Sequence, residues 1–133
     1  MRNLKYPVIL ENEFDMGAFS SESKMCICGE QSLDEGFMEN TFIIDSEGGF
    51  YEITEVNKLQ NISWVPTFLI PYKSRIVKVR FNLEYINKLD FLSIKKRILN
   101  VFMKNKVQRS KRVISRINKA ENMNQLFNAI GID

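Results

Sequence analysis

The sequence contains no histidine among its 133 residues. Histidine is the commonest general base in enzymes and a frequent zinc ligand, so its absence excludes Ser-His-Asp and Cys-His catalytic groups and every imidazole zinc site. No serine elbow, phosphate-binding loop or HExxH motif is present either. We therefore expect a protein that is not an enzyme and that carries neither a metal nor another cofactor.

Cysteine is scarce: the sequence holds two, Cys26 and Cys28. They lie too close together to close a useful loop, so we expect free thiols in a reducing compartment. A complete zinc site would need ligands from a second chain. The pair is predicted to act as small, half-buried apolar side chains, and the alternative is a role in soft-metal binding or disulfide exchange.

Long hydrophobic runs are also missing. No window reaches the roughly 18 uninterrupted apolar residues of a membrane span, and the first residues lack a signal-peptide pattern. We expect a cytoplasmic protein with no membrane contact. A hydrophobic fraction of 44% with ten phenylalanines is enough for a folded core, and the length predicts a single α+β domain over residues 1–133.

The strongest structural pattern is the stretch Arg75–Ile86. Apolar residues alternate there with charged and polar ones, at Val77, Val79, Phe81, Leu83 and Tyr85. A period of two is typical of a strand with one buried face and one solvated face. We expect this strand to lie centrally in a sheet that the C-terminal helices cover.

The segments before this strand are also strand-like. Leu4–Leu10 is predicted as a first strand, with Pro7 marking an edge or an end. Thr41–Val56 is predicted as a β-hairpin, because the sequence DSEGG between its two apolar runs supplies turn residues. Ile62–Ile70 is predicted as an extended segment that Pro66 interrupts.

Helical spacing begins after the central strand. Asp90 is a plausible N-cap for a helix that runs to about Asn105. Two further helices are predicted over 113–120 and 123–130, with a capping box at Asn122 favouring a break over one continuous helix. The fold class is therefore α+β, an antiparallel sheet of four to five strands covered by two to three C-terminal helices.

Charge is divided unevenly along the chain, although the net charge is only +3. Residues 11–55 hold twelve acidic side chains and one basic one, whereas residues 56–120 hold sixteen basic and two acidic ones. Such asymmetry indicates an electrostatic partner, or two halves that neutralise each other in the fold.

The acidic half supplies one set of candidate site residues. A calcium loop beginning at Asp45 is excluded, because positions six and twelve are Phe50 and Val56 instead of glycine and glutamate. The acidic side chains are instead predicted to form a face for a basic protein partner, the alternative being ordinary solvated loops and strands. The candidates are Glu11, Glu13, Asp15, Asp45, Glu47, Glu52 and Glu55.

The basic half supplies a second set. Residues 91–120 carry ten lysines and arginines and no acidic residue. Such a surface attracts phosphate backbones, so nucleic-acid binding is an alternative function; the simpler interpretation is the solvated side of amphipathic helices. The candidates are Lys104, Lys106, Arg109, Lys111, Arg112 and Arg116.

The acidic hairpin FIIDSEGGFYEITE and the strand RIVKVRFNLEYI followed by helices resemble the small cytosolic immunity proteins of bacterial toxin systems, including contact-dependent inhibition. The resemblance implies a compact α+β protein that neutralises one cognate toxin by binding it, and it assigns no functional residue. The main hypothesis is therefore an immunity-like or antitoxin-like module whose acidic face occludes a toxin. Its oligomeric state is left open.

Overall fold

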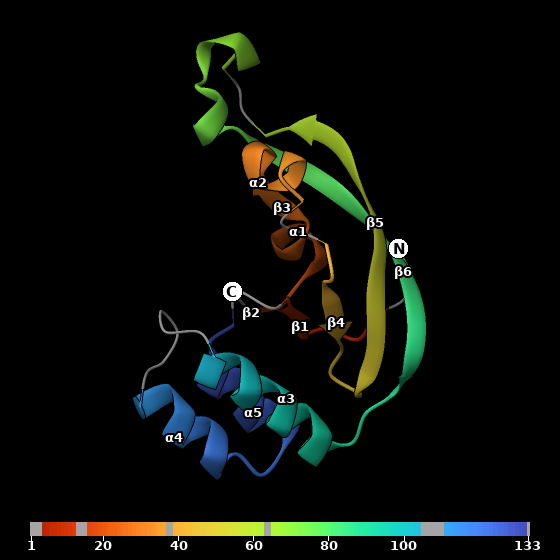
Figure 1. Ribbon diagram of the computed structural model, residues 1–133, viewed down its shortest axis with the longest axis vertical. Helices are drawn as coiled ribbons and strands as arrows, with labels where there is room; N and C mark the ends of the chain where they lie inside the picture. Colours follow the sequence, from red (N-terminus) through yellow and green to blue (C-terminus); the bar gives the residue numbers. More distant parts are fainter. Residues whose placement is uncertain (1–3, 13–15, 37–38, 63–64, 105–110, 133) are drawn as a thin grey trace.

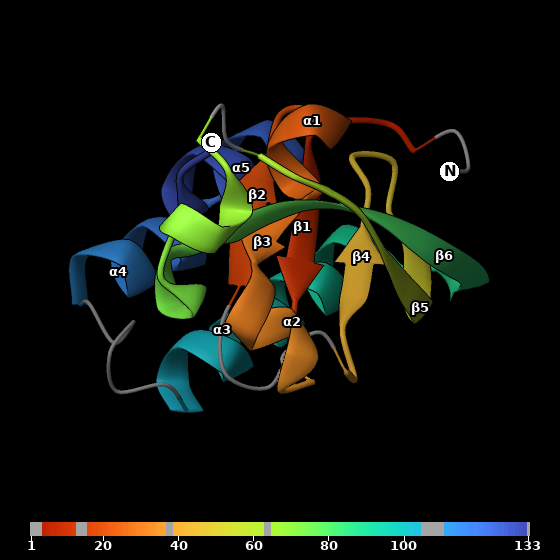
Figure 2. The ribbon, with the colours of Figure 1, turned by 90° about the horizontal axis from the view of Figure 1, so that it is seen from above.

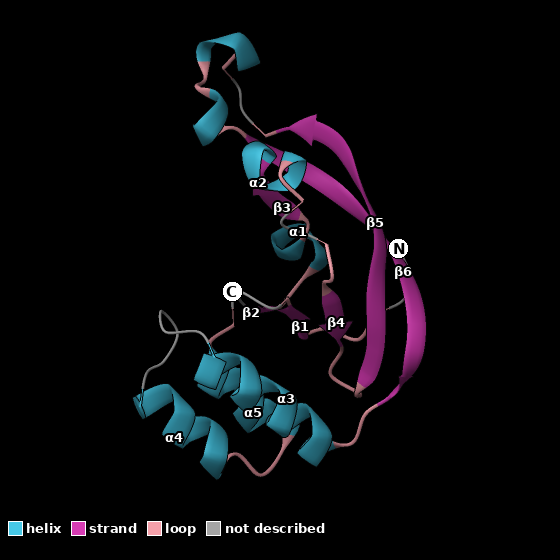
Figure 3. Ribbon diagram, viewed as in Figure 1, coloured by secondary structure: helices cyan, strands magenta, loops and turns pink. Residues whose placement is uncertain are grey.

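The fold was analysed in a computed structural model, which describes residues 4–12, 16–36, 39–62, 65–104 and 111–132. Within these residues six strands form one antiparallel sheet in the order β2-β1-β4-β5-β6-β3 (Figure 3). The strands are β1 (Val8–Glu11), β2 (Met16–Phe19), β3 (Ile27–Gly29), β4 (Phe42–Ile44), β5 (Gly49–Asn61) and β6 (Ile76–Lys88).

Helices complete the α+β fold. The two short ones are α1 (Glu22–Met25) and α2 (Glu30–Asp34), and the three longer ones are α3 (Phe91–Lys104), α4 (Lys111–Lys119) and α5 (Met123–Ile130). The predicted fold class is confirmed, with six strands in place of four or five. No helix in the described part of the chain is long and apolar enough to cross a membrane.

The sheet curls, and it therefore has an inner and an outer face (Figure 1). Figure 2 shows the long ribbon of β5 and β6 arching across the shorter strands. The inner face encloses one apolar cluster, the inner core, made of Leu4, Val8, Met25, Cys26, Ile43, Ile53, Val77, Val79 and Phe81.

The outer face carries a second cluster where α3, α4 and α5 cover it. This helix-side core contains Ile9, Met16, Ala18, Ile44 and Phe50 from the sheet and Ile94, Ile98, Phe102, Ile117, Ala120, Leu126, Phe127 and Ala129 from the helices and their ends. Val8 and Ile9 enter different cores, as do Ile43 and Ile44. Side chains of a strand point alternately to its two faces, so these strands are apolar on both sides.

The strand predicted over 75–86 is confirmed as β6, but its position is not the expected one. It lies between β5 and β3, and its buried side chains, such as Val77 and Phe81, belong to the inner core. The helices instead pack on β1, β2, β4 and the start of β5. The outer face of β6 carries exposed charged residues such as Lys78 and Arg80, and an amphipathic helix packed on that face would have to bury these charges.

The helix boundaries follow the predicted caps. The Asp90 carboxylate accepts a hydrogen bond from the backbone N–H of Ser93 at 2.7 Å, which starts α3. Asn122 likewise accepts a hydrogen bond from the N–H of Gln125 at 2.9 Å, and α4 has ended at Lys119. The break near Asn122 is therefore confirmed.

The predicted hairpin is confirmed as β4 and β5, and its turn is fixed against the start of α3. Gly48 has φ +88° in this turn, a conformation that favours glycine. Its carbonyl accepts a hydrogen bond from the Leu89 N–H at 2.8 Å, and a Cβ atom at Gly48 would lie 2.5 Å from the Leu89 carbonyl oxygen. The turn therefore positions the chain for α3.

Of the segment predicted as extended over 62–70, positions 63 and 64 lie outside the described residues, and residues 65–70 belong to a projection, which we call the arm (residues 65–75). It contains two short 3-10 helices, η1 (Thr67–Leu69) and η2 (Tyr72–Ser74). The carbonyls of Pro66 and Pro71 accept the hydrogen bonds that close these turns. Proline fixes φ near the value that a 3-10 turn needs, so it begins turns here instead of bending a strand.

Candidate functional site

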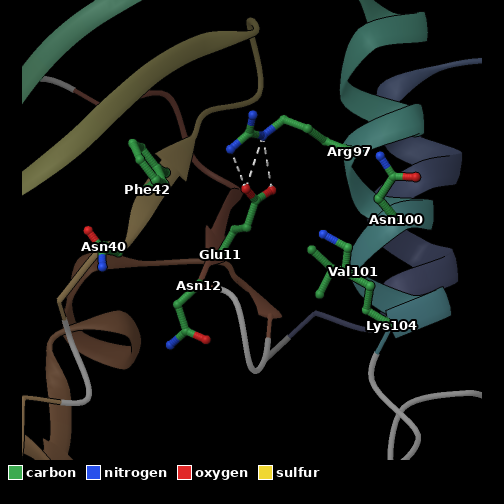
Figure 4. A pocket seen from close by; sticks show the side chains of 8 residues that line it. All are labelled: Glu11, Asn12, Asn40, Phe42, Arg97, Asn100, Val101 and Lys104. Carbon is green, nitrogen blue, oxygen red and sulfur yellow. Dashed lines mark hydrogen bonds and ion pairs between the residues drawn. The ribbon is translucent and has the colours of Figure 1, made fainter.

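A polar cavity of about 450 Å³ lies where α3 crosses the ends of β1 and β4 (Figure 4). One side of α3 faces it, because positions three or four apart share a helix face. The side chains that line it are Glu11, Asn12, Asn40, Phe42, Arg97, Asn100, Val101 and Lys104.

An ion pair between Glu11 and Arg97 forms one wall of the cavity. Arg97 Nη2 lies 2.6 Å from Glu11 Oε1, and Arg97 Nε lies 3.0 and 3.3 Å from Oε1 and Oε2. Glu11 is 5% exposed. The guanidinium carbon also lies 4.5 Å from the Phe50 ring centroid and 5.6 Å from that of Phe42, within cation–π range. Arg97 is therefore held by charge and by two rings.

The rest of the cavity wall offers amides and one ammonium group. Asn100 and Lys104 extend from α3, and Asn40 faces them from the segment before β4 (Figure 4). Carboxamides both donate and accept hydrogen bonds, and lysine only donates. These side chains are suited to holding a polar group. The carboxylate of the lining, that of Glu11, is already paired with Arg97.

The structure separates the predicted acidic residues into different environments. Glu11 is buried against Arg97, and Asp45 is buried in the hairpin turn, where Oδ1 accepts hydrogen bonds from the N–H groups of Glu47 at 3.0 Å and Gly49 at 2.9 Å. The prediction that Glu11 and Asp45 belong to an exposed acidic face is therefore wrong, because both carboxylates serve donors inside the fold. Glu13 and Asp15 lie outside the described residues.

Three acidic side chains do gather on the outer face of the β5–β6 ribbon, and we call them the acidic row: Glu52, Glu55 and Glu84. Glu52 lies directly opposite Glu84, and Glu55 lies opposite Asn82, which donates to its carboxylate at 2.7 Å. Sequence reasoning missed Glu84, although the polar side of the predicted strand contains it. Glu47, also a candidate, is exposed in the turn between β4 and β5.

Like charges placed opposite each other on a sheet destabilise it. Neither Glu52 nor Glu84 forms an ion pair with a lysine or arginine in the described part of the chain. The acidic row therefore remains available to cations from outside.

The predicted basic residues lie on and beside α4. Lys104, Lys111, Arg112 and Arg116 are all exposed, whereas Lys106 and Arg109 lie outside the described residues. Lys119 follows Arg116 by three positions, so Arg112, Arg116 and Lys119 share one helix face.

The two charged halves also meet inside the molecule. Besides the Glu11–Arg97 pair, Lys58 Nζ lies 3.0 Å from Glu30 and 3.4 Å from Asp34. Each of these pairs joins the acidic half to the basic half. Part of the charge asymmetry is therefore neutralised within the fold, which was the alternative interpretation of the sequence.

The Lys58 pair belongs to a network that reaches the arm. The Tyr72 hydroxyl donates a hydrogen bond to the Asp34 carboxylate, and this bond is the main reason that the Asp34 pKa is lowered. The pKa of Lys58 is raised, first by its hydrogen bond to Glu30. Because Tyr72 lies in η2, these contacts tie the arm to α2.

The arm exposes apolar side chains of the segment that the sequence predicted to be extended. Phe68 is 81% exposed and Leu69 is 62% exposed. They lie on η1 at the end of the molecule opposite the long helices (Figure 1). Four more apolar side chains on and beside the arm are between 41% and 48% exposed: Leu59, Ile62, Tyr72 and Ile76.

The two thiols pack against the inner core. Burial, followed by the charge of Glu22, raises the pKa of Cys26 to about 11, and burial raises the pKa of Cys28. The thiolate is the reactive and metal-binding form, so both groups are weak nucleophiles at neutral pH. Nowhere in the described ranges do three or more cysteine, aspartate or glutamate side chains gather as metal ligands.

No protein-family model, no curated protein and no solved structure matches this chain. Function therefore has to follow from the placement of its own side chains. The arm and the acidic row are exposed features of the β5–β6 ribbon, and the face of α4 is an exposed basic surface.

Proposed function

We propose that this chain is a non-enzymatic protein-binding module of the immunity or antitoxin type, which neutralises a cognate bacterial toxin in the cytoplasm by covering its working surface. The observation that carries the proposal is the exposure of Phe68 and Leu69 on an ordered arm. Exposed apolar side chains grouped on a projection are typical of protein interfaces, whose binding energy is concentrated in a few such anchors.

The scaffold supports this role because it holds the arm in place. The Tyr72 hydroxyl donates a hydrogen bond to the Asp34 carboxylate, and Arg75 Nε donates one to the Ile70 carbonyl at 3.2 Å. The Arg75 guanidinium also lies 5.8 Å from the Tyr72 ring centroid. A preorganised binding segment loses less conformational entropy on association, so its apolar contacts contribute more to affinity.

The acidic row supplies the charge of the proposed interface. Glu55 precedes Leu59 by four residues on β5, a separation of about 13 Å along a strand. The occupant we propose is a protein with an apolar cleft for Phe68 and lysines or arginines beside it that meet the row. Complementary charge of this kind accelerates association and makes it sensitive to salt.

The first test is affinity capture from the source cell lysate, at low and moderate salt, with nuclease added. Wild type is compared with a Phe68→Asp/Leu69→Asp variant and with Leu92→Asp, a matched control because Leu92 is 75% exposed on α3. We expect one stoichiometric protein that wild type and the control retain and the arm variant loses. Equal retention by the arm variant would contradict the role of the arm.

The second test addresses the acidic residues in the purified complex. Charge reversal at Glu47, Glu52 and Glu55 is expected to slow association roughly tenfold or more at low salt and to flatten its salt dependence. Three matched reversals at the exposed Glu35, Glu39 and Glu121 serve as the control. Unchanged association after reversal of the first three would remove the acidic part of the proposal.

A second candidate function is nucleic-acid binding by α4. The observation that favours it is the exposed alignment of Arg112, Arg116 and Lys119 on one helix face. Affinity for a duplex should then fall with salt, and the slope should become shallower by about 0.9 for each phosphate that a variant no longer neutralises. Lysate capture that disappears with nuclease would favour this function, whereas weak binding insensitive to Lys111→Gln and Arg112→Gln would exclude it.

A further inference from the structure

A groove of about 640 Å³ runs along α4 beside the end of α3. We propose that it binds a short apolar protein segment flanked by acidic residues. This site is separate from the arm and the acidic row, and the proposal does not depend on the function of either. The described residues that line it are Met103, Lys111, Ile114, Ser115, Asn118 and Lys119.

The lining combines an apolar floor with polar edges. Met103 is 50% exposed at the end of α3, and Ile114 is half-buried on the side of α4 that faces it. An apolar side chain placed on this floor would remove both from water. Ser115 and Asn118 lie on the same side of α4 and can hydrogen-bond a peptide backbone.

The charge of the groove selects an acidic ligand. Lys111 and Lys119 lie at its two ends, and neither α3 nor α4 contains an acidic residue. Carboxylates on a ligand would complement the positive charge of these two lysines. The arm of a second copy is a poor occupant, because Lys73 and Arg75 would bring further positive charge to the two lysines.

The spacing of the lysines indicates the pattern of the ligand. Lys119 follows Lys111 by eight positions of helix, which corresponds to about 12 Å. An extended peptide covers that distance in about four residues at 3.3 Å each. The preferred segment is therefore acidic, any, apolar, any, acidic, with the central side chain on Met103 and Ile114.

The experiment is selection of a displayed library of random twelve-residue peptides on the whole protein. We expect enrichment of peptides with an apolar residue between two acidic ones. Their affinity, measured by fluorescence anisotropy, should fall at least tenfold with Lys111→Glu/Lys119→Glu and with Met103→Ser. Lys96→Glu and Leu92→Ser are the matched controls, since both residues are exposed on α3 away from the groove, and thermal unfolding verifies that every variant is folded.

The other possible occupants are tested with a single-stranded twelve-nucleotide DNA and with oleate. DNA binding that depends on Lys111 and Lys119 but not on Met103 would overturn the proposal in favour of phosphate recognition. Displacement of the peptides by micromolar oleate would overturn it in favour of an amphiphilic anion. Enriched peptides without acidic residues, no enrichment at all, or binding that survives both groove variants would overturn it as well.

Discussion

The two ends of the molecule depart in opposite ways from the usual rule that charged side chains are exposed and apolar ones are buried. At the end covered by the long helices, Glu11 and Asp45 are buried. At the arm end, Phe68 and Leu69 are exposed. Charged residues are rarely buried unless they are paired, and Glu11 and Asp45 find their partners inside the fold. Because Phe68 and Leu69 remain open to solvent, the arm is where we expect a partner.

The largest expected effect comes from removing the counter-ion at the helix-covered end. Arg97→Met would leave the Glu11 carboxylate buried without its partner, and it should lower the free energy of unfolding by about 2–3 kcal/mol, below the full value for a buried pair because Arg97 is partly exposed. Chemical denaturation monitored by circular dichroism measures the change.

The control for this prediction is a double-mutant cycle. Glu11→Gln combined with Arg97→Met removes both charges, so we expect it to recover part of the stability that Arg97→Met alone loses. If the single and double variants were equally unstable, the ion pair would not be what holds this end together.

The next effect concerns the turn between β4 and β5, which contacts Leu89 just before α3. Gly48→Ala should lower the free energy of unfolding by about 2 kcal/mol, because a positive φ and a close contact with the Leu89 carbonyl act together. Gly131→Ala is the matched control: Gly131 has φ +93°, but a Cβ atom there meets nothing within 4 Å. It should lose about 1 kcal/mol. Equal losses would show that the contact with Leu89 is unimportant.

A smaller effect should appear in acid at the start of α3. The backbone hydrogen bond from Ser93 holds the pKa of Asp90 below its ordinary value of 3.8. A lowered folded-state pKa means that the ionised carboxylate favours the fold. Its contribution is present above about pH 4 and is lost as the pH falls through the folded-state pKa.

Asp90→Asn keeps the hydrogen-bond acceptor but does not titrate. Melting temperatures measured from pH 6 to pH 2 should therefore fall less steeply for Asp90→Asn than for wild type. Parallel curves for the two proteins would mean that Asp90 has no electrostatic role in capping α3.

The smallest expected effect on stability is at the arm. Phe68→Ser combined with Leu69→Ser should change the free energy of unfolding by less than about 0.5 kcal/mol, because both side chains are already exposed. Thermal unfolding of the purified protein checks this. A large loss would show that the arm is part of the core, and the comparison between the two ends would fail.

Much of the fold could be predicted because its signals are local. The alternation in β6, the turn residues at 45–49 and the caps at Asp90 and Asn122 each reflect steric or hydrogen-bonding rules that operate within a few residues. The arm was predicted as an extended segment because Phe68 and Leu69 belong to an apolar run. Apolar composition does not distinguish a buried strand from an exposed projection.

The amino-acid sequence by itself determined the fold class, the hairpin and the three C-terminal helices of this protein. Only the tertiary structure decided which carboxylates are buried in ion pairs and which are exposed to solvent. Glu11 and Glu55 are equivalent as letters in an acidic stretch, yet one meets Arg97 across 86 positions of sequence and the other lies exposed beside Glu52 and Glu84. The electrostatic environment of a carboxylate depends on atoms a few ångströms away in space, and their distance along the chain does not specify it.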